Sequence, residues 1–181
     1  MSQRYEIRFS GAGGQGLILA GVIMAEAASI YDGKQAVQSQ SYGPEARGGA
    51  SKSEVIVSDS LIDYPKATVV DALLALTQEA CDKYSHDLKE GGVLLIDSDL
   101  VTRQPKGNFK VVSFPIINTA KNDVGREIVA NIVALGAMVA LTGVVTKESA
   151  EKAVLARVPE AFVDLNKKAF QMGYDKAIAA K

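Results

Sequence analysis

Residues 5–20 read YEIRFSGAGGQGLILA, and this stretch decides the fold class. Polar and apolar residues alternate over 5–9, which predicts a half-buried strand. The glycines that follow predict a tight turn. The apolar, alanine-rich run from Leu17 to Ile30 predicts a buried helix, which ends at the turn signal Asp32-Gly33. A strand, a glycine-rich turn and a helix in this order are typical of an α/β protein.

The rest of the sheet is predicted from the same patterns, with strands over 34–40, 53–58, 69–74, 93–96 and 110–114. Strands alternate with helices over the first 115 residues, which predicts a sheet covered on both faces. A loop alone separates 34–40 from 53–58, so these strands are expected to be antiparallel neighbours. We therefore expect a three-layer α/β/α fold with a mixed, mostly parallel sheet and a helical C-terminal part, in a single domain over residues 1–181.

Later helices are predicted from caps and spacing. One begins after Thr77 and runs to about Lys89, where Gly91-Gly92 ends it. Another covers 124–141, and its apolar residues have helical spacing: Ile128, Ile132, Leu135 and Val139. Two more follow, one capped by Thr146 and broken at Val158-Pro159, and an amphipathic one over 160–179.

Charge and hydropathy exclude two classes of partner. The 181 residues include 20 basic and 21 acidic side chains, a formal net charge of −1, so the electrostatic footprint of a nucleic-acid-binding protein is missing. The most apolar stretch, 128–145, contains Asn131 and is shorter than the ~20 residues that span a bilayer. The first nine residues carry two arginines and no long apolar run, so we expect no signal peptide, no membrane contact and a cytoplasmic location.

Cys81 is the only cysteine and His86 the only histidine. This chain alone therefore cannot form a disulfide, a zinc site or an iron–sulfur cluster. Nucleophilic catalysis through an imidazole would have to use His86, which we expect to be solvated at the end of a surface helix. Cys81 is expected to be a packing residue. No catalytic residue and no metal ligand is predicted.

The first glycine loop, Gly11 to Gly16, matches G-x-G-x-x-G between a strand and a helix. Backbone N–H groups at such a junction favour an anion. A dinucleotide site also needs an acidic residue at the end of the second strand, and that strand ends in Gln38-Ser39-Gln40. Four interpretations stay open: a nicotinamide site, a tight junction without ligand, a site for another phosphate-bearing ligand, and a contact with a partner subunit.

The second glycine loop, residues 39–51, reads SQSYGPEARGGAS. Arg47 beside Gly48-Gly49 combines a guanidinium with bare backbone N–H groups, an environment that suits phosphate or carboxylate. The alternative is an ordered turn in which Glu45 and Arg47 are solvated. Two smaller groups are interpreted in the same way: Asp97-Ser98-Asp99 as a plain turn rather than a magnesium site, and Lys121, Asp123, Arg126 and Glu127 as a charged helix start or a subunit contact.

Both loops, with the strand Ser53 to Ser58 that follows, resemble the gamma subunit of 2-oxoacid:ferredoxin oxidoreductases, most of all its 2-oxoglutarate branch. Later pieces of the chain agree with that resemblance: Asp63-Tyr64-Pro65, Asp71-Ala72-Leu73, Asn131 with Leu135-Gly136, and Asn166 with Ala169-Phe170 and Gly173-Tyr174. The resemblance spans nearly the whole chain.

The resemblance implies a heteromeric enzyme that converts a 2-oxoacid and coenzyme A to acyl-CoA and CO2 and reduces ferredoxin. Its other parts are expected to be alpha and beta subunits, which bind thiamine diphosphate and Mg, and a ferredoxin-like subunit with iron–sulfur clusters. This chain is expected to be inactive alone and to line a coenzyme A or partner-facing cleft with Gly13, Gly14, Gln15, Gly16, Tyr42, Arg47, Gly48 and Gly49. A homodimer of the isolated chain stays open.

Three alternatives remain at this point. The first is a sibling subunit acting on pyruvate, branched-chain or indolepyruvate substrates. The second is a self-standing nicotinamide or flavin protein, and the third is a non-enzymatic assembly module. The missing acid at the end of the second strand counts against a nicotinamide site, and a cofactor titration would decide it.

Overall fold

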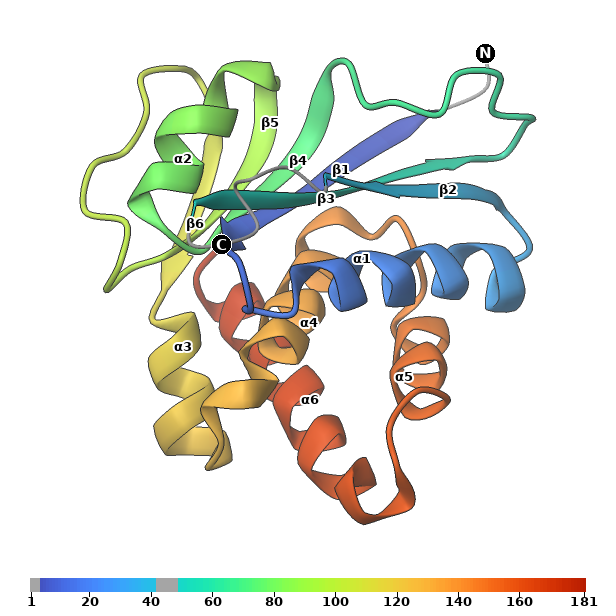
Figure 1. Cartoon of the computed structure of the whole chain (residues 1–181), viewed down its shortest axis with the longest axis vertical. Coiled ribbons are helices and arrows are strands. Elements are labelled where there is room, and N and C mark those ends of the chain that lie inside the picture. The colour runs from blue at the N-terminus through green and yellow to red at the C-terminus, as the bar shows by residue number, and fades with distance from the viewer. Residues whose placement is uncertain (1–3, 42–48) are drawn as a thin grey trace.

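The computed structural model describes residues 4–41 and 49–181 (Figure 1). Its centre is a six-stranded sheet in the order β2-β3-β1-β4-β5-β6. The strands are β1 (Tyr5–Ala12), β2 (Gln35–Gln40), β3 (Ala50–Ser58), β4 (Val70–Ala75), β5 (Leu88–Asp97) and β6 (Lys110–Phe114). β1 is parallel to β4, and the β4–β5 and β5–β6 pairs are parallel as well. β3 is antiparallel to both β1 and β2, which confirms the mixed sheet and the antiparallel pair that follow from the short connection.

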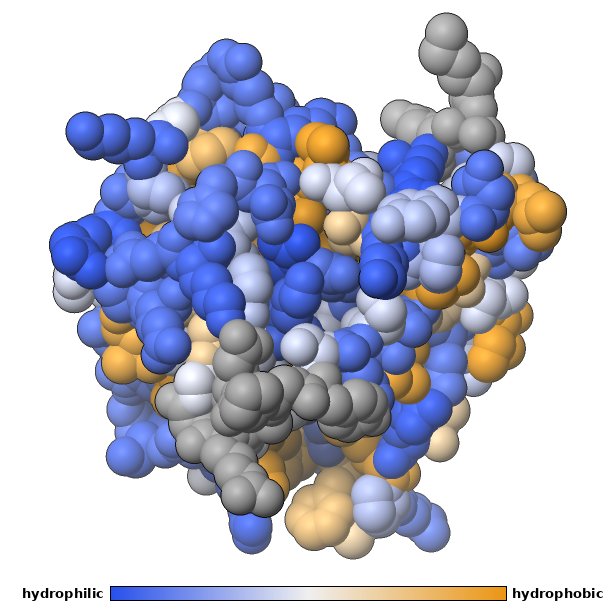
Figure 2. Space-filling view, turned by 45° about the horizontal axis from the view of Figure 1, so that its top comes forward, coloured by the Kyte–Doolittle hydropathy of each residue, from blue (hydrophilic) through white to orange (hydrophobic). Residues whose placement is uncertain are grey.

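Helices cover the two faces of the sheet unequally (Figure 1). The larger core lies on the face of α1 (Leu17–Glu26) and α4 (Ala130–Thr142), with α5 (Lys147–Leu155) and α6 (Val163–Ala179) packed beyond them. The smaller core lies on the other face, under α2 (Gln78–Tyr84). The short α3 (Ile116–Asn118) follows β6. Figure 2 brings the side opposite α1 towards the reader, and mostly hydrophilic residues appear there.

Two predicted helices have different bounds in the structure. The helix after Thr77 ends at Tyr84, and Gly91-Gly92 lies inside β5 rather than at a helix end. Gly91 has φ +74°, and the register between β4 and β5 shifts nearby, so this glycine belongs to an irregular strand. The predicted helix over 124–141 starts only at Ala130, because Gly125 with φ +109° ends the preceding turn.

That late start changes the environment of one apolar residue. Ile132, Leu135 and Val139 are buried as their helical spacing predicts. Ile128 lies in the short turn Glu127–Val129 before α4, and 83 % of its surface is exposed. The helical spacing that includes Ile128 in the sequence is therefore wrong for this residue, because the helix does not extend to it.

The packing of α4 against α6 depends on two glycines. A Cβ atom at Gly173 would overlap the carbonyl oxygen of Val133, and one at Gly136 would overlap the carbonyl oxygen of Phe170. The two backbones therefore approach more closely than any side chain at these positions allows. The start of α6 is thereby held beside the start of α4.

Asp32 joins the end of the first helical segment to the start of α5. It accepts hydrogen bonds from the Thr146 N–H (2.8 Å), the Thr146 hydroxyl (2.9 Å) and the Ser149 hydroxyl (2.5 Å). Thr146 itself caps α5, as predicted, by accepting from the Ser149 N–H. Partial burial of Asp32 acts to raise the pKa of its carboxyl, but the hydrogen bonds from Ser149 and Thr146 outweigh it and hold that pKa below the usual value.

Replacing Asp32 by asparagine is expected to lower the free energy of unfolding by about 1 kcal/mol at neutral pH. A carboxyl whose folded-state pKa is depressed stabilises the fold above its unfolded pKa of about 4 and loses that effect as pH falls through the folded value. The difference between wild type and variant should therefore be present at pH 7 and shrink towards pH 2–3, as urea unfolding at several pH values would measure. A difference that stays constant down to acid pH would contradict this role.

None of the helices in residues 4–41 and 49–181 combines the length and the hydropathy that a membrane span requires.

Candidate functional site

The first glycine loop connects β1 to α1 through a left-handed backbone conformation that glycine adopts easily. Gly14 and Gly16 have φ values of +86° and +74°, in the left-handed region. The Gln15 side-chain oxygen accepts a hydrogen bond from the Ala12 N–H at 2.7 Å and closes the turn. The first turn of α1 then begins at Leu17 with its free N–H groups beside this loop. The predicted strand–turn–helix junction is confirmed.

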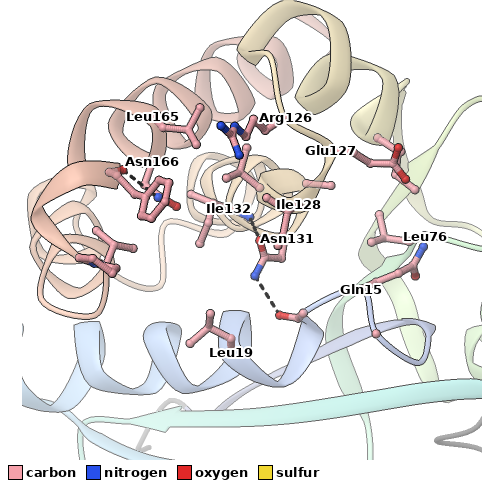
Figure 3. A pocket seen from close by; sticks show the side chains of 18 residues that line it. Gln15, Leu19, Leu76, Arg126, Glu127, Ile128, Asn131, Ile132, Leu165 and Asn166 are labelled. Atoms are coloured by element: carbon pink, nitrogen blue, oxygen red, sulfur yellow. Dashed lines mark hydrogen bonds between the residues drawn. The ribbon is translucent and has the colours of Figure 1, made fainter.

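Asn131 at the start of α4 supports the same loop. Its side-chain N–H donates to the Gly16 carbonyl oxygen at 3.2 Å, across 115 residues of sequence (Figure 3). A Cβ atom at Gly16 would lie 2.5 Å from that nitrogen, so the contact needs glycine at this position. Asn131 is buried. The sequence contains one indication of its role, namely that it is a polar residue inside an apolar stretch.

The second glycine loop leaves the sheet beside the first. The last residue of β1, Ala12, pairs with the first residue of β3, Ala50, so the first loop starts where the second ends. Gly49 is half-buried at that point. The Tyr84 hydroxyl donates to the Ala50 carbonyl at 3.1 Å, and the Glu79 carboxylate accepts from the Ala50 N–H at 3.3 Å. The predicted site residues Tyr42, Arg47 and Gly48 lie outside the described residues.

At the same place, the helices that follow two neighbouring strands lie on opposite faces of the sheet. α1 follows β1 on one face, whereas α2 follows the neighbouring β4 on the other face. Ligands of open α/β sheets bind beyond the carboxyl ends of the strands at such a switch point. The strand order does not reproduce the dinucleotide fold, because β3 separates β1 from β2. An acid at the end of β2 would therefore not lie next to the glycine loop, and this counts against a nicotinamide site.

A cavity of about 690 Å³ opens beside the first glycine loop (Figure 3). Its walls come from α1, the start of α4, and the turn before α6 with the first residues of that helix. The size falls in the range of small-molecule sites, and most of the lining is apolar. The lining residues are Gly14, Gln15, Gly16, Leu19, Leu76, Ile117, residues 126–132, Val158, Pro159, Phe162, Leu165 and Asn166.

Two charged side chains stand at the rim of this cavity. Arg126 and Glu127 are exposed, and neither side chain has a hydrogen bond or ion pair within residues 4–41 and 49–181. Of the predicted charged cluster, Asp123 is instead paired with Lys176 on α6, at 2.8 Å. Of the four residues, Arg126 and Glu127 border this cavity, and Lys121 and Asp123 do not.

The structure also places His86, Cys81 and the turn at Asp97, for which no catalytic or metal-binding role was predicted. His86 is exposed, and Cys81 is wholly buried among the apolar residues under α2. Burial, with the nearby charge of Asp82, raises the pKa of the Cys81 thiol to about 11, so it is protonated at neutral pH. Asp97 is wholly buried and accepts from three backbone N–H groups, those of Asp99, Leu100 and Ile117, which confirms the plain turn. In the part of the chain that the structure describes, no three acidic, histidine or cysteine side chains gather to hold a metal ion.

The fold is an α/β domain with an apolar cavity beside a glycine-rich turn between strand and helix. A family model described as pyruvate ferredoxin/flavodoxin oxidoreductase matches residues 6–176. The 2-oxoglutarate synthase subunit KorC of Methanocaldococcus jannaschii is 53 % identical over 179 residues, which cover 98 % of this chain and 96 % of that one. The gamma subunit of a keto/oxoacid ferredoxin oxidoreductase from Geobacter sulfurreducens is 82 % identical, with a TM-score of 0.94 and 99 % of both chains covered.

A longer chain contains the same fold. The 2-oxoglutarate:ferredoxin oxidoreductase of Magnetococcus marinus, solved with 2-oxoglutarate, coenzyme A and succinyl-CoA bound, matches with a TM-score of 0.86 at 21 % identity. The match covers 99 % of this chain and 32 % of that one. The chain belongs to the pyruvate ferredoxin/flavodoxin oxidoreductase family. It is a gamma subunit of a 2-oxoacid:ferredoxin oxidoreductase, similar to KorC subunits, and so part of an oxidoreductase complex.

Proposed function

We propose that this chain is the gamma subunit of a 2-oxoglutarate:ferredoxin oxidoreductase, which converts 2-oxoglutarate and coenzyme A to succinyl-CoA and CO2 and passes electrons to ferredoxin. The choice of 2-oxoglutarate is supported by KorC relatives from several archaea, of which the Methanocaldococcus subunit is 53 % identical. A pyruvate, branched-chain or indolepyruvate enzyme is the competing assignment, and a panel of 2-oxoacids separates them.

The two glycine loops form the coenzyme A or partner-facing cleft of this subunit. The observation that carries this proposal is the pairing of Ala12 with Ala50, which brings the starting point of one loop to the end point of the other. Gly13 to Gly16 and the first turn of α1 offer backbone N–H groups at that edge. Arg47 with Gly48 and Gly49 would add a guanidinium and further N–H groups for the phosphates of coenzyme A.

The remaining chemistry belongs to other subunits. An iron–sulfur cluster typically needs about four thiolates, and this sequence has one cysteine, which is buried. The clusters would therefore be held by the ferredoxin-like subunit, and we assign thiamine diphosphate with its Mg²⁺ to the alpha and beta subunits. This chain would shape the cleft and remain inactive alone.

Assembly can be tested by tagging the chain in its native host and purifying it anaerobically. The proposal expects larger chains to co-purify, with iron and thiamine diphosphate in the sample. A lone chain without iron, from an extract that does oxidise 2-oxoglutarate, would overturn it.

Replacing Arg47 by alanine is expected to raise the KM for coenzyme A about tenfold, because one charge-assisted hydrogen bond to phosphate is lost. Steady-state kinetics of the intact complex measures this. Arg103→Ala is the matched control, since Arg103 is an exposed arginine paired with Asp82. An unchanged KM in an intact complex would rule out the binding role, and dissociation of the complex would make Arg47 an assembly residue instead.

A further inference from the structure

Asn131 borders the cavity beside the first glycine loop, yet each polar atom of its side chain has a partner inside the protein. Its Oδ1 accepts a hydrogen bond from the Ile132 N–H at 2.9 Å, at the start of α4. Its Nδ2 donates to the Gly16 carbonyl oxygen at 3.2 Å, at the start of α1 (Figure 3). The residue is only 5 % exposed. Its side chain is therefore a link between the starts of two helices rather than a group held ready for a ligand.

The Gly16 carbonyl that Asn131 contacts belongs to the first peptide unit of α1. The same oxygen accepts a hydrogen bond from the Ala20 N–H at 3.1 Å, so two donors fix its direction. In a planar trans peptide the N–H points opposite to the C=O, so the direction of the Leu17 N–H is fixed as well. In the part of the chain that the structure describes, neither the Leu17 N–H nor the Ile18 N–H has an acceptor. Asn131 therefore orients donors that are available to an anion at the glycine loop.

The backbone of the glycine loop needs such support, because glycine loses more conformational freedom on ordering than any other residue. A Cβ atom at Gly14 would meet no atom within 4 Å, so the middle of the loop is open. The Gln15 side chain secures the β1 end of the loop by accepting from the Ala12 N–H at 2.7 Å, and Asn131 secures the α1 end at Gly16. A loop that is held at both ends loses less entropy when a ligand binds to it.

We propose that Asn131 is a positioning residue for coenzyme A. By holding the Gly16 carbonyl, it keeps the first glycine loop in the conformation that receives a phosphate group of coenzyme A. The inference rests on the proposed function and adds to it a residue that lies outside both glycine loops. The hydrogen bond to Gly16 stays the same while the bound substrate reacts, so its contribution is equal in the ground state and the transition state. Loss of Asn131 therefore raises the KM for coenzyme A and leaves kcat nearly unchanged.

The test compares two asparagines in steady-state kinetics of the intact complex. Asn131→Ala is expected to raise the KM for coenzyme A about tenfold, with kcat within about twofold of wild type. Asn166→Ala is the matched control, because Asn166 is also buried, lines the same cavity and donates one hydrogen bond to a carbonyl oxygen, that of Phe162 at 2.9 Å. Its loss leaves the glycine loop in place, so the KM should stay within about twofold of wild type. Asn131→Asp keeps the side-chain volume but presents no donor to Gly16 at neutral pH, and it should raise the KM at least as much as Asn131→Ala.

The outcomes separate this inference from the proposed function. If the wild-type complex shows no coenzyme A-dependent oxidation of a 2-oxoacid, the proposed function fails. If wild type depends on coenzyme A and Asn131→Ala leaves the KM unchanged, the positioning role is wrong and the proposed function stands. Equal rises for Asn131→Ala and Asn166→Ala would assign the effect to the cavity as a whole and overturn the inference. A fall in kcat at unchanged KM, or dissociation of a complex whose chains are folded, would overturn it as well. Thermal unfolding of each chain verifies its fold, and Asn131→Asp supplies the measurement if Asn131→Ala does not fold.

Discussion

Replacing Gly173 by alanine is expected to lower the free energy of unfolding by about 3 kcal/mol or more, equivalent to a fall in Tm of roughly 10 °C. Gly173 lies where α6 crosses α4, and a Cβ atom there would overlap the Val133 carbonyl oxygen. The backbone of α4 cannot yield as a flexible side chain would, so the two helices have to separate. Both helices contribute buried residues to the larger core.

The direction of this effect is informative because helix propensity predicts the opposite. Alanine is favoured over glycine within a helix by about 1 kcal/mol, so a position with free space would become more stable. Lys168→Ala, at an exposed position of α6, is the matched control and should change stability by less than about 0.5 kcal/mol. Thermal and urea unfolding would measure both, and a Gly173→Ala chain as stable as wild type would show that the helices do not approach this closely.

Replacing Arg8 by alanine is expected to cost about 3–5 kcal/mol, because it removes one partner of a buried ionic group. The Arg8 side chain is 2 % exposed on the face of β1 opposite α1, and its guanidinium pairs with Glu54 at 2.7 Å and Asp87 at 2.6 Å. The same guanidinium lies over the Tyr84 ring, 5.3 Å from its centre. Without Arg8, the contact with Lys52 at 2.9 Å is the one ion pair that the buried Glu54 carboxylate keeps among the described residues.

Two further variants identify the cause of that loss. Arg8→Lys keeps the charge but cannot reproduce the planar fork that reaches both carboxylates, so an intermediate loss is expected. Arg103→Ala removes an exposed pair with Asp82 and should cost at most about 1 kcal/mol. Equal effects of Arg8→Ala and Arg103→Ala on urea unfolding would contradict a burial-dependent role.

Strand positions were predictable from the sequence because each strand has a clear apolar pattern and a turn signal beside it. The 110–114 strand has the predicted bounds, and the short connection between 34–40 and 53–58 predicted their antiparallel pairing correctly. Helix ends were less predictable. Gly91-Gly92 resembles a helix stop in sequence, yet Gly91 serves an irregular strand, since a positive φ suits either structure.

The candidate site was predictable in part. The first glycine loop is a local pattern, so its turn and the helix after it follow from adjacent residues. The adjacency of the two loops depends on the pairing of Ala12 with Ala50, a contact between distant residues that no local pattern carries. The cavity was missed for the same reason, because its walls come from α1, α4 and α6. Ile128 was included in the predicted helix because the apolar spacing continues through it, whereas the positive-φ glycine at position 125 delays the start of α4.

One rate measurement tests most directly whether this chain serves a 2-oxoglutarate-specific oxidoreductase, as we propose. The anaerobically purified complex is assayed for coenzyme A-dependent reduction of a viologen dye with 2-oxoglutarate, pyruvate, a branched-chain 2-oxoacid and indolepyruvate in parallel. We predict a kcat/KM for 2-oxoglutarate at least about tenfold above that of each other substrate, a difference of about 1.4 kcal/mol in transition-state stabilisation, and no rate without coenzyme A. A complex that oxidises pyruvate or another 2-oxoacid and leaves 2-oxoglutarate unchanged would contradict the assignment.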